Sequence, residues 1–151
     1  MNILVVRLRA LGDIVHTIPA VAALRRAYPT ARIDWLVEAK HSEILALVPV
    51  IDHLVVVRDP SLLAWVDATR QVRGARYDTA LDFQGLMKSA VLARASGARR
   101  VLGFSIWHLR EKGARPFYSE SLEPSREPAQ SSDSRWGCIG AGRCRSPCCP
   151  A

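Results

Sequence analysis

Short apolar runs alternate with helical patterns along the first part of the chain. The run Asn2–Val6 is rich in β-branched residues, which is typical of a strand buried on both faces of a sheet. After Gly12, apolar side chains return at steps of three and four residues and predict a helix. The same alternation predicts further strands at 32–37, 54–57, 77–83 and 100–104, and helices at 42–47, 59–74 and 86–95. Strands that alternate with helices favour right-handed βαβ units, so we expect an α/β fold: a Rossmann-like three-layer domain with a mostly parallel sheet.

Capping residues predict where two of the helices begin. Asp13 stands where the N-cap of the first helix is expected. Pro19 lacks a backbone N–H, so this helix either kinks there or starts afresh after Thr17. The pair Asp59-Pro60 predicts an N-cap followed by a proline in the first helical position.

The composition changes near residue 119. Residues 119–151 are rich in Ser, Pro, Cys and Gly and poor in aliphatic side chains, so they cannot build a hydrophobic core. We therefore expect an ordered domain over 1–118 and a disordered tail over 119–151, as an out-of-frame or truncated translation would produce. All four cysteines lie in this tail, without histidines and without the paired spacing of a structural zinc site. No metal site is expected.

The charge of the chain favours anionic partners. Lys and Arg number 21 and Asp and Glu 14, a formal net charge of +7, and the excess lies in the first 118 residues. Aromatic residues are not interleaved with the basic ones as a stacking platform would need, so no nucleic-acid partner is expected. No apolar run reaches the roughly 18 residues of a membrane span. A cytoplasmic location is the default expectation.

The predicted topology places a ligand site at two loops. In an open parallel sheet, ligands bind beyond the carboxyl ends of the strands, where the strand order reverses. With the usual order 3-2-1-4-5, the first and fourth strands are neighbours at that crevice. The loops to consider are therefore Arg7–Asp13 and Asp82–Ser89, and both carry polar side chains.

Asp13 and Gly12 are the candidate residues of the first loop. Asp13 is either a structural helix cap or a general base that takes a proton from an incoming hydroxyl. Gly12 allows a substrate to approach the backbone closely.

Gln84 and Lys88 are the candidates of the second loop. At a helix start they are four residues apart and can point the same way. Lys88 offers a compact cation for a carboxylate or phosphate, and Gln84 offers a donor and an acceptor for sugar hydroxyls. The structural alternatives are an ordinary surface lysine and an amide that braces the loop.

Two nucleotide-binding motifs are missing. The first loop has one glycine, not the GxGxxG fingerprint of dinucleotide binding, and the Lys-Ser pair of the second loop lacks the frame of a P-loop. An NAD-dependent oxidoreductase-like Rossmann domain and a non-enzymatic anion-binding module both remain open as alternative functions.

Four stretches carry a resemblance to a known family. They include Leu11-Gly12-Asp13 and the run Asp-Phe-Gln-Gly-Leu-Met-Lys-Ser that begins at Asp82, and they cover 3–20, 31–38, 77–90 and 110–118. Together they resemble the amino-terminal half of a lipopolysaccharide heptosyltransferase of glycosyltransferase family 9. The run that begins at Asp82 is most similar to the type that adds the first heptose.

The resemblance implies a specific reaction. Such enzymes have a GT-B fold of two Rossmann-like domains. The amino-terminal domain holds a Kdo-lipid A acceptor, and the carboxyl-terminal domain binds the donor ADP-heptose. Transfer is inverting and needs no metal or other cofactor, with Asp13 as the catalytic base and Gly12, Gln84, Lys88 and Arg110 in the substrate site. The resemblance further implies a fragment without the donor domain, inactive alone, and a peripheral position on the inner face of the cytoplasmic membrane.

Overall fold

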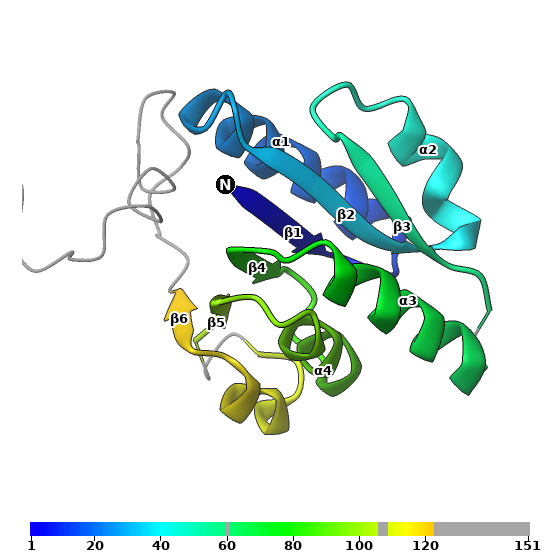
Figure 1. The fold of residues 1–151 in the computed structure, drawn as a ribbon, viewed down its shortest axis with the longest axis vertical. Coiled ribbons are helices and arrows are strands. Elements are labelled where there is room, and N and C mark those ends of the chain that lie inside the picture. Colours follow the sequence, from blue (N-terminus) through cyan, green and yellow to red (C-terminus); the bar gives the residue numbers. More distant parts are fainter. Residues whose placement is uncertain (60, 106–108, 123–151) are drawn as a thin grey trace, which may run out of the picture.

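A six-stranded parallel sheet forms the centre of the computed structural model, which describes residues 1–59, 61–105 and 109–122 (Figure 1). The strand order is β3-β2-β1-β4-β5-β6, and every pair of neighbours is parallel. The strands are β1 (Asn2–Val6), β2 (Arg32–Glu38), β3 (His53–Val57), β4 (Thr79–Asp82), β5 (Arg100–Phe104) and β6 (Glu120–Leu122). The predicted α/β class and parallel sheet are confirmed.

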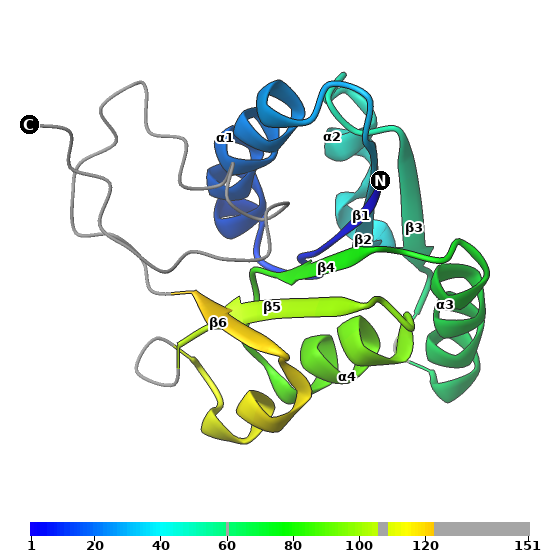
Figure 2. The ribbon, with the colours of Figure 1, turned by 60° about the vertical axis from the view of Figure 1, so that its left-hand side comes forward.

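Helices cover both faces of the sheet, as the three-layer prediction requires (Figure 2). The α-helices are α1 (Leu11–Ala27), α2 (Ser42–Ala46), α3 (Leu62–Gly74) and α4 (Met87–Ala95). Two short 3₁₀ helices, η1 (Ala39–His41) and η2 (Lys112–Phe117), complete the described elements. Within these ranges, no helix has the length and apolar character to cross a membrane.

Strand β1 supplies side chains to two separate cores. Leu4 and Val6 belong to the core under α3 and α4, whereas Ile3 and Val5 belong to the core under α1 and α2. Successive side chains of a strand point to opposite faces, so a strand covered on both sides must be apolar at every position. This is the physical reason for the uninterrupted apolar run at the start of the sequence.

Both predicted helix starts are wrong by a few residues. Helix α1 begins at Leu11 with Ala10 as its N-cap, a non-glycine residue at a φ of 66° that offers no side-chain cap. Asp13 therefore lies inside the first turn. The N-cap of α3 is Ser61, whose hydroxyl accepts a hydrogen bond from the Ala64 amide at 3.3 Å, and Pro60 lies outside the described residues.

Helix α1 runs through Pro19 as one element of 17 residues, so of the two alternatives, a kink or a restart after Thr17, the restart is wrong. The Thr17 hydroxyl donates a hydrogen bond to the backbone carbonyl of Asp13 at 2.7 Å. Buried side chains before and after the proline, such as Ile14 and Val21, pack on the same core. That packing continues the helix despite the missing backbone hydrogen bond.

The sheet continues past the predicted domain boundary at 118. Strand β6 pairs with β5, the Ser119 amide donates to the Val101 carbonyl at 2.8 Å, and Arg100 pairs with Glu120 at 2.7 Å. The expectation of disorder is therefore wrong for residues 119–122. These residues carry no alternating pattern, so only their pairing with β5 makes them a strand. Residues 123–151, with all four cysteines, lie outside the described residues.

Gly103 of β5 packs directly against an aromatic ring, which gives a test of this edge of the fold. A Cβ at Gly103 would lie 2.5 Å from ring atoms of Tyr118, so a Gly103→Ala variant must displace the ring or the strand. We expect the free energy of unfolding to fall by about 1–3 kcal/mol in urea titrations. Gly74→Ala is the matched control, because a Cβ there meets nothing within 4 Å and the variant should keep or slightly gain stability. Equal stability of the two variants would contradict the packing.

Candidate active site

The candidate site lies where β1 and β4 end side by side. Val6, the last residue of β1, is in register with Asp82, the last residue of β4, so the loops that follow the two strands face each other. A third segment joins them, because the Glu111 amide donates to the Gly85 carbonyl at 3.1 Å. Gly85 has a φ of +69°, and a Cβ there would lie 3.3 Å from Leu109. This close approach brings Arg110 to the two loops.

Asp13 is held by two arginines that come from different segments. Its Oδ2 forms an ion pair with Nη2 of Arg7, and it accepts a hydrogen bond from Nη2 of Arg110 at 3.0 Å. Its other carboxylate oxygen, Oδ1, has no partner among the described residues. The side chain is 32% exposed. One oxygen of Asp13 is thus fixed by the protein while the other can accept a proton from a ligand.

Arg7 is the site residue that sequence reasoning missed. Its side chain is buried, and its Nη1 donates to the carbonyl of Phe83 in the second loop. Burial is the main cause that lowers the pKa of Arg7; the nearby Arg110 adds to this, while Asp13 and Asp82 oppose it. The sequence signal is a cation directly after the buried apolar run of β1. Arg7 ties the two loops together and orients Asp13.

Gln84 braces the first loop. It is buried, and its Oε1 accepts a hydrogen bond from the Leu8 amide at 2.7 Å. The structure therefore shows the loop-bracing role that was left open as the alternative to sugar binding. A contact of its amide nitrogen with a substrate stays a prediction.

Lys88 and Gly12 are exposed at the same edge of the sheet. Lys88 lies in the first turn of α4 and has no ion-pair partner among the residues that the structure describes. Gly12 lies in the first turn of α1, where a Cβ would meet nothing within 4 Å. The backbone here does not itself require glycine, so its predicted use in close substrate approach stays a prediction.

The buried carboxylate of Asp82 holds the second loop through hydrogen bonds. It accepts hydrogen bonds from the Tyr118 hydroxyl at 2.6 Å, the Ser89 hydroxyl at 2.8 Å and the backbone N–H of Gln84 at 2.8 Å. Burial raises the pKa of Asp82, while these hydrogen bonds act in the opposite direction. The same burial, together with the carboxylate, raises the pKa of Tyr118. Asp82 connects β4, α4 and the segment after η2 at one point.

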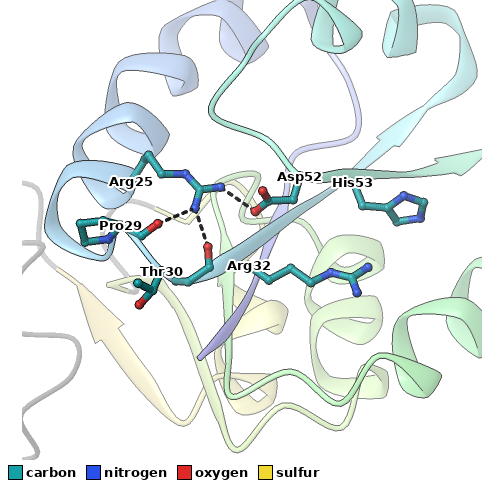
Figure 3. Close-up of a pocket in the computed structure, with 7 residues that line it drawn as sticks. Arg25, Pro29, Thr30, Arg32, Asp52 and His53 are labelled. Carbon is teal, nitrogen blue, oxygen red and sulfur yellow. Dashed lines mark hydrogen bonds and ion pairs between the residues drawn. The ribbon is translucent and has the colours of Figure 1, made fainter.

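A hollow of about 520 Å³ lies elsewhere, at the amino ends of β2 and β3 (Figure 3). Arg25 spans it, donating to the carbonyl of Val50 at 3.0 Å and pairing with Asp52 at 2.6 Å. Asp52 also accepts from the Ile33 amide at 2.7 Å. These polar groups hold the end of α1 to the sheet, and the hollow lies away from the carboxyl ends of the strands, where ligands bind in such folds.

Comparison with known proteins gives consistent matches. The family model described as glycosyltransferase family 9 (heptosyltransferase) matches residues 65–132. Lipopolysaccharide heptosyltransferase 1 of Pseudomonas aeruginosa is 33% identical over 78% of this chain, and its Campylobacter coli counterpart is 32% identical over 81%. The chain belongs to glycosyltransferase family 9, the heptosyltransferases. It spans 36% of the length of both relatives.

Solved glycosyltransferases share this fold. The Escherichia coli heptosyltransferase WaaC with ADP-2-deoxy-2-fluoro heptose superposes with a TM-score of 0.73 at 26% identity, over 85% of this chain and 44% of that one. A family 9 glycosyltransferase from Veillonella parvula gives a TM-score of 0.72 at 24% identity, over 83% of this chain and 37% of that one. The Rossmann-like prediction is confirmed by these superpositions.

The described part of this chain offers no cluster of metal-ligating side chains. No group of three or more His, Cys, Asp or Glu side chains there could hold a metal ion. The site is built instead from one half-exposed carboxylate, Asp13, and a set of cations.

The raised pKa of Asp82 predicts a pH dependence of stability. The folded chain holds this proton more tightly than the unfolded chain, whose Asp82 has the ordinary pKa of 3.8. The contribution of Asp82 to the free energy of unfolding is therefore fully present below pH 3.8 and is lost as the pH rises through the raised pKa.

Asp82→Asn cannot ionise, so we expect this variant to lack that part of the pH dependence. Urea unfolding of the parent and the variant at a series of pH values measures it. The exposed Asp67→Asn is the control and should keep the parent's profile. Parallel profiles for the parent and Asp82→Asn would contradict the assignment.

Proposed function

We propose that this chain supplies the acceptor side of a heptosyltransferase that moves heptose from ADP-heptose to a Kdo-lipid A acceptor with inversion. The observation that carries the proposal is Asp13, with one carboxylate oxygen fixed by Arg7 and Arg110 and the other without a partner among the described residues. The setting of this carboxylate at the carboxyl edge of a parallel sheet, and the family to which the chain belongs, both support it.

In this reaction Asp13 acts as the general base. Its Oδ1 takes the proton from the attacking hydroxyl of the acceptor as the oxygen forms a bond to the anomeric carbon of heptose. The bond from that carbon to the diphosphate breaks on the opposite face, so ADP leaves with the electron pair and the configuration inverts. Arg7 holds the carboxylate in one orientation, which places the base before the substrate arrives.

Arg110 and Lys88 recognise the negative charges of the acceptor. The Arg110 side chain is 58% exposed and uses one nitrogen on Asp13, so its other N–H groups can meet a carboxylate or phosphate. Lys88 adds a cation from the other loop, without an ion-pair partner in the part of the chain that the structure describes. Such an acceptor is lipid-linked, so the proposed place of action is the inner surface of the cytoplasmic membrane.

Acceptor binding can be tested on the 151-residue chain by calorimetry with a soluble, Kdo-containing phosphorylated oligosaccharide. We expect binding that weakens with salt and a Kd about tenfold higher in Arg110→Gln or Lys88→Gln, since each variant loses a charge-assisted contact. Arg94→Gln, exposed at the other end of α4, is the matched control and should leave Kd unchanged. Binding of NAD without binding of the oligosaccharide would instead favour the oxidoreductase alternative.

The catalytic role of Asp13 needs a donor site, which a chimera can supply. Residues 1–122 are joined to the remaining length of the Pseudomonas aeruginosa relative, and transfer from ADP-heptose is measured. We expect Asp13→Asn to lower kcat by about 10²- to 10⁴-fold, because general-base assistance is lost, while the Kd for the acceptor changes little. Asp67→Asn serves as control. Full activity of Asp13→Asn would reduce this residue to a structural role.

Acceptor binding without transfer, in a chimera that also binds ADP-heptose, would favour the alternative of a non-enzymatic anion-binding module.

A further inference from the structure

Glu111 joins the segment 109–111 to the second loop of the candidate site. Its backbone amide donates to the Gly85 carbonyl at 3.1 Å, and its Oε2 accepts from the Met87 amide at 2.6 Å, in the first turn of α4. Both hydrogen bonds that the structure describes between this segment and the loop are made by this one residue. Its side chain is exposed, so the carboxylate keeps the contact although water could also solvate it.

The charge of Glu111 opposes the charge of the ligand that the site is proposed to bind. Arg110 precedes it in the chain, and Lys88 follows Met87, whose amide it accepts. Both cations are proposed to meet negative groups of the acceptor. A carboxylate next to them repels an anion, so charge alone would favour a neutral residue at position 111. The contribution of Glu111 must therefore be geometric.

The two cations differ in how their backbones are held. Lys88 lies in α4, whose first turn has hydrogen bonds of its own, such as that from the Leu86 amide to the Ser89 hydroxyl at 3.1 Å. Arg110 lies in the irregular chain before η2 and its side chain is 58% exposed. Its backbone position therefore depends on the contacts of its neighbour, Glu111.

Helix η2 anchors Glu111 from the other side. The Ala114 amide donates to the Glu111 carbonyl at 3.0 Å, and Ala114 is fully buried in the core. Helix η2 packs beside α4, and a Cβ at Gly113 would lie 3.0 Å from the sulfur of Met87 (Figure 2). Glu111 is thus the joint between a packed element and the exposed Arg110.

We propose that Glu111 is a positioning residue for acceptor binding. Its carboxylate fastens residues 109–111 to α4 and keeps the Arg110 guanidinium beside Asp13, where it meets a carboxylate or phosphate of the acceptor. The inference rests on the proposed function, in which Arg110 recognises that charge. A fixed Arg110 loses less conformational freedom on binding, and this gain exceeds the repulsion by Glu111, because solvent and salt screen an exposed charge.

Two variants that remove the same charge test the proposal in the calorimetric titration of the 151-residue chain with the oligosaccharide. Glu111→Gln keeps a side-chain oxygen that can accept from the Met87 amide, whereas Glu111→Ala keeps none. We expect Glu111→Ala to raise Kd about fivefold, because a charge-assisted hydrogen bond is lost, and Glu111→Gln to stay within about twofold of the parent. Repulsion alone predicts tighter binding in both variants.

Double variants identify the cation through which Glu111 acts. In the Arg110→Gln background, adding Glu111→Ala should change Kd less than about twofold, because the side chain that it positions is already absent. In the Lys88→Gln background, the same change should keep its effect of about fivefold. A general loosening of the fold would instead weaken binding equally in both backgrounds.

Kinetics and a control complete the design. In the chimera, Glu111→Ala should raise KM for the acceptor about fivefold and leave kcat within about twofold, because Arg7 still holds Asp13. Asp67→Ala removes an equal charge from the exposed surface of α3 and should leave Kd and KM unchanged.

Three results would overturn the inference alone: oligosaccharide binding by Glu111→Ala that is as tight as in the parent or tighter, equal losses in the Arg110→Gln and Lys88→Gln backgrounds, or an equal loss in Asp67→Ala. A parent chain that binds no oligosaccharide would refute the proposed function, and the role of Glu111 with it. The titration of the parent therefore separates the two failures.

Discussion

The parallel pairing of β1 with β4 is the constraint on which the site depends. Because Val6 and Asp82 end their strands in register, the chain must leave the sheet twice at the same place. The buried guanidinium of Arg7 fills the space between the two exits, with the Phe83 carbonyl on one side and the Asp13 carboxylate on the other. Burying a cation without partners is costly, so both loops are held wherever Arg7 can be satisfied. The orientation of Asp13 is a consequence of that requirement.

The sheet could be predicted from the sequence because its strands appear as short apolar runs between helical patterns. Strands β1 and β5 have the predicted bounds, and the predicted order of the first five strands is correct, since buried parallel strands read as unbroken apolar runs. The start of α1 could not be predicted from capping preferences. Its N-cap is Ala10 at a positive φ, a conformation that tertiary contacts impose and that no preference of alanine suggests. Strand β6 was missed because its three residues follow no period.

The site was predictable in position and only partly in detail. The edge of the sheet, Asp13 and the second loop follow from topology, and Arg110 followed from the family resemblance. Their contact joins residues 97 positions apart, which no local pattern reports. Gln84 lies in the second loop, yet its side-chain oxygen accepts from the Leu8 amide, because a buried loop must satisfy its backbone groups before it can serve a ligand. Arg7 was overlooked because arginine is normally a surface residue.

The first turn of α4 has an unusual source of stabilisation. The Met87 amide donates to the carboxylate of Glu111 at 2.6 Å, so the negative charge at the start of this helix comes from a residue 24 positions later in the chain. The Tyr118 hydroxyl reaches back 36 positions to Asp82 in the same way. During synthesis, the ribosome releases α4 and the second loop well before either partner exists. The loops of the candidate site can therefore make their final contacts only after the segment around η2 has been synthesised.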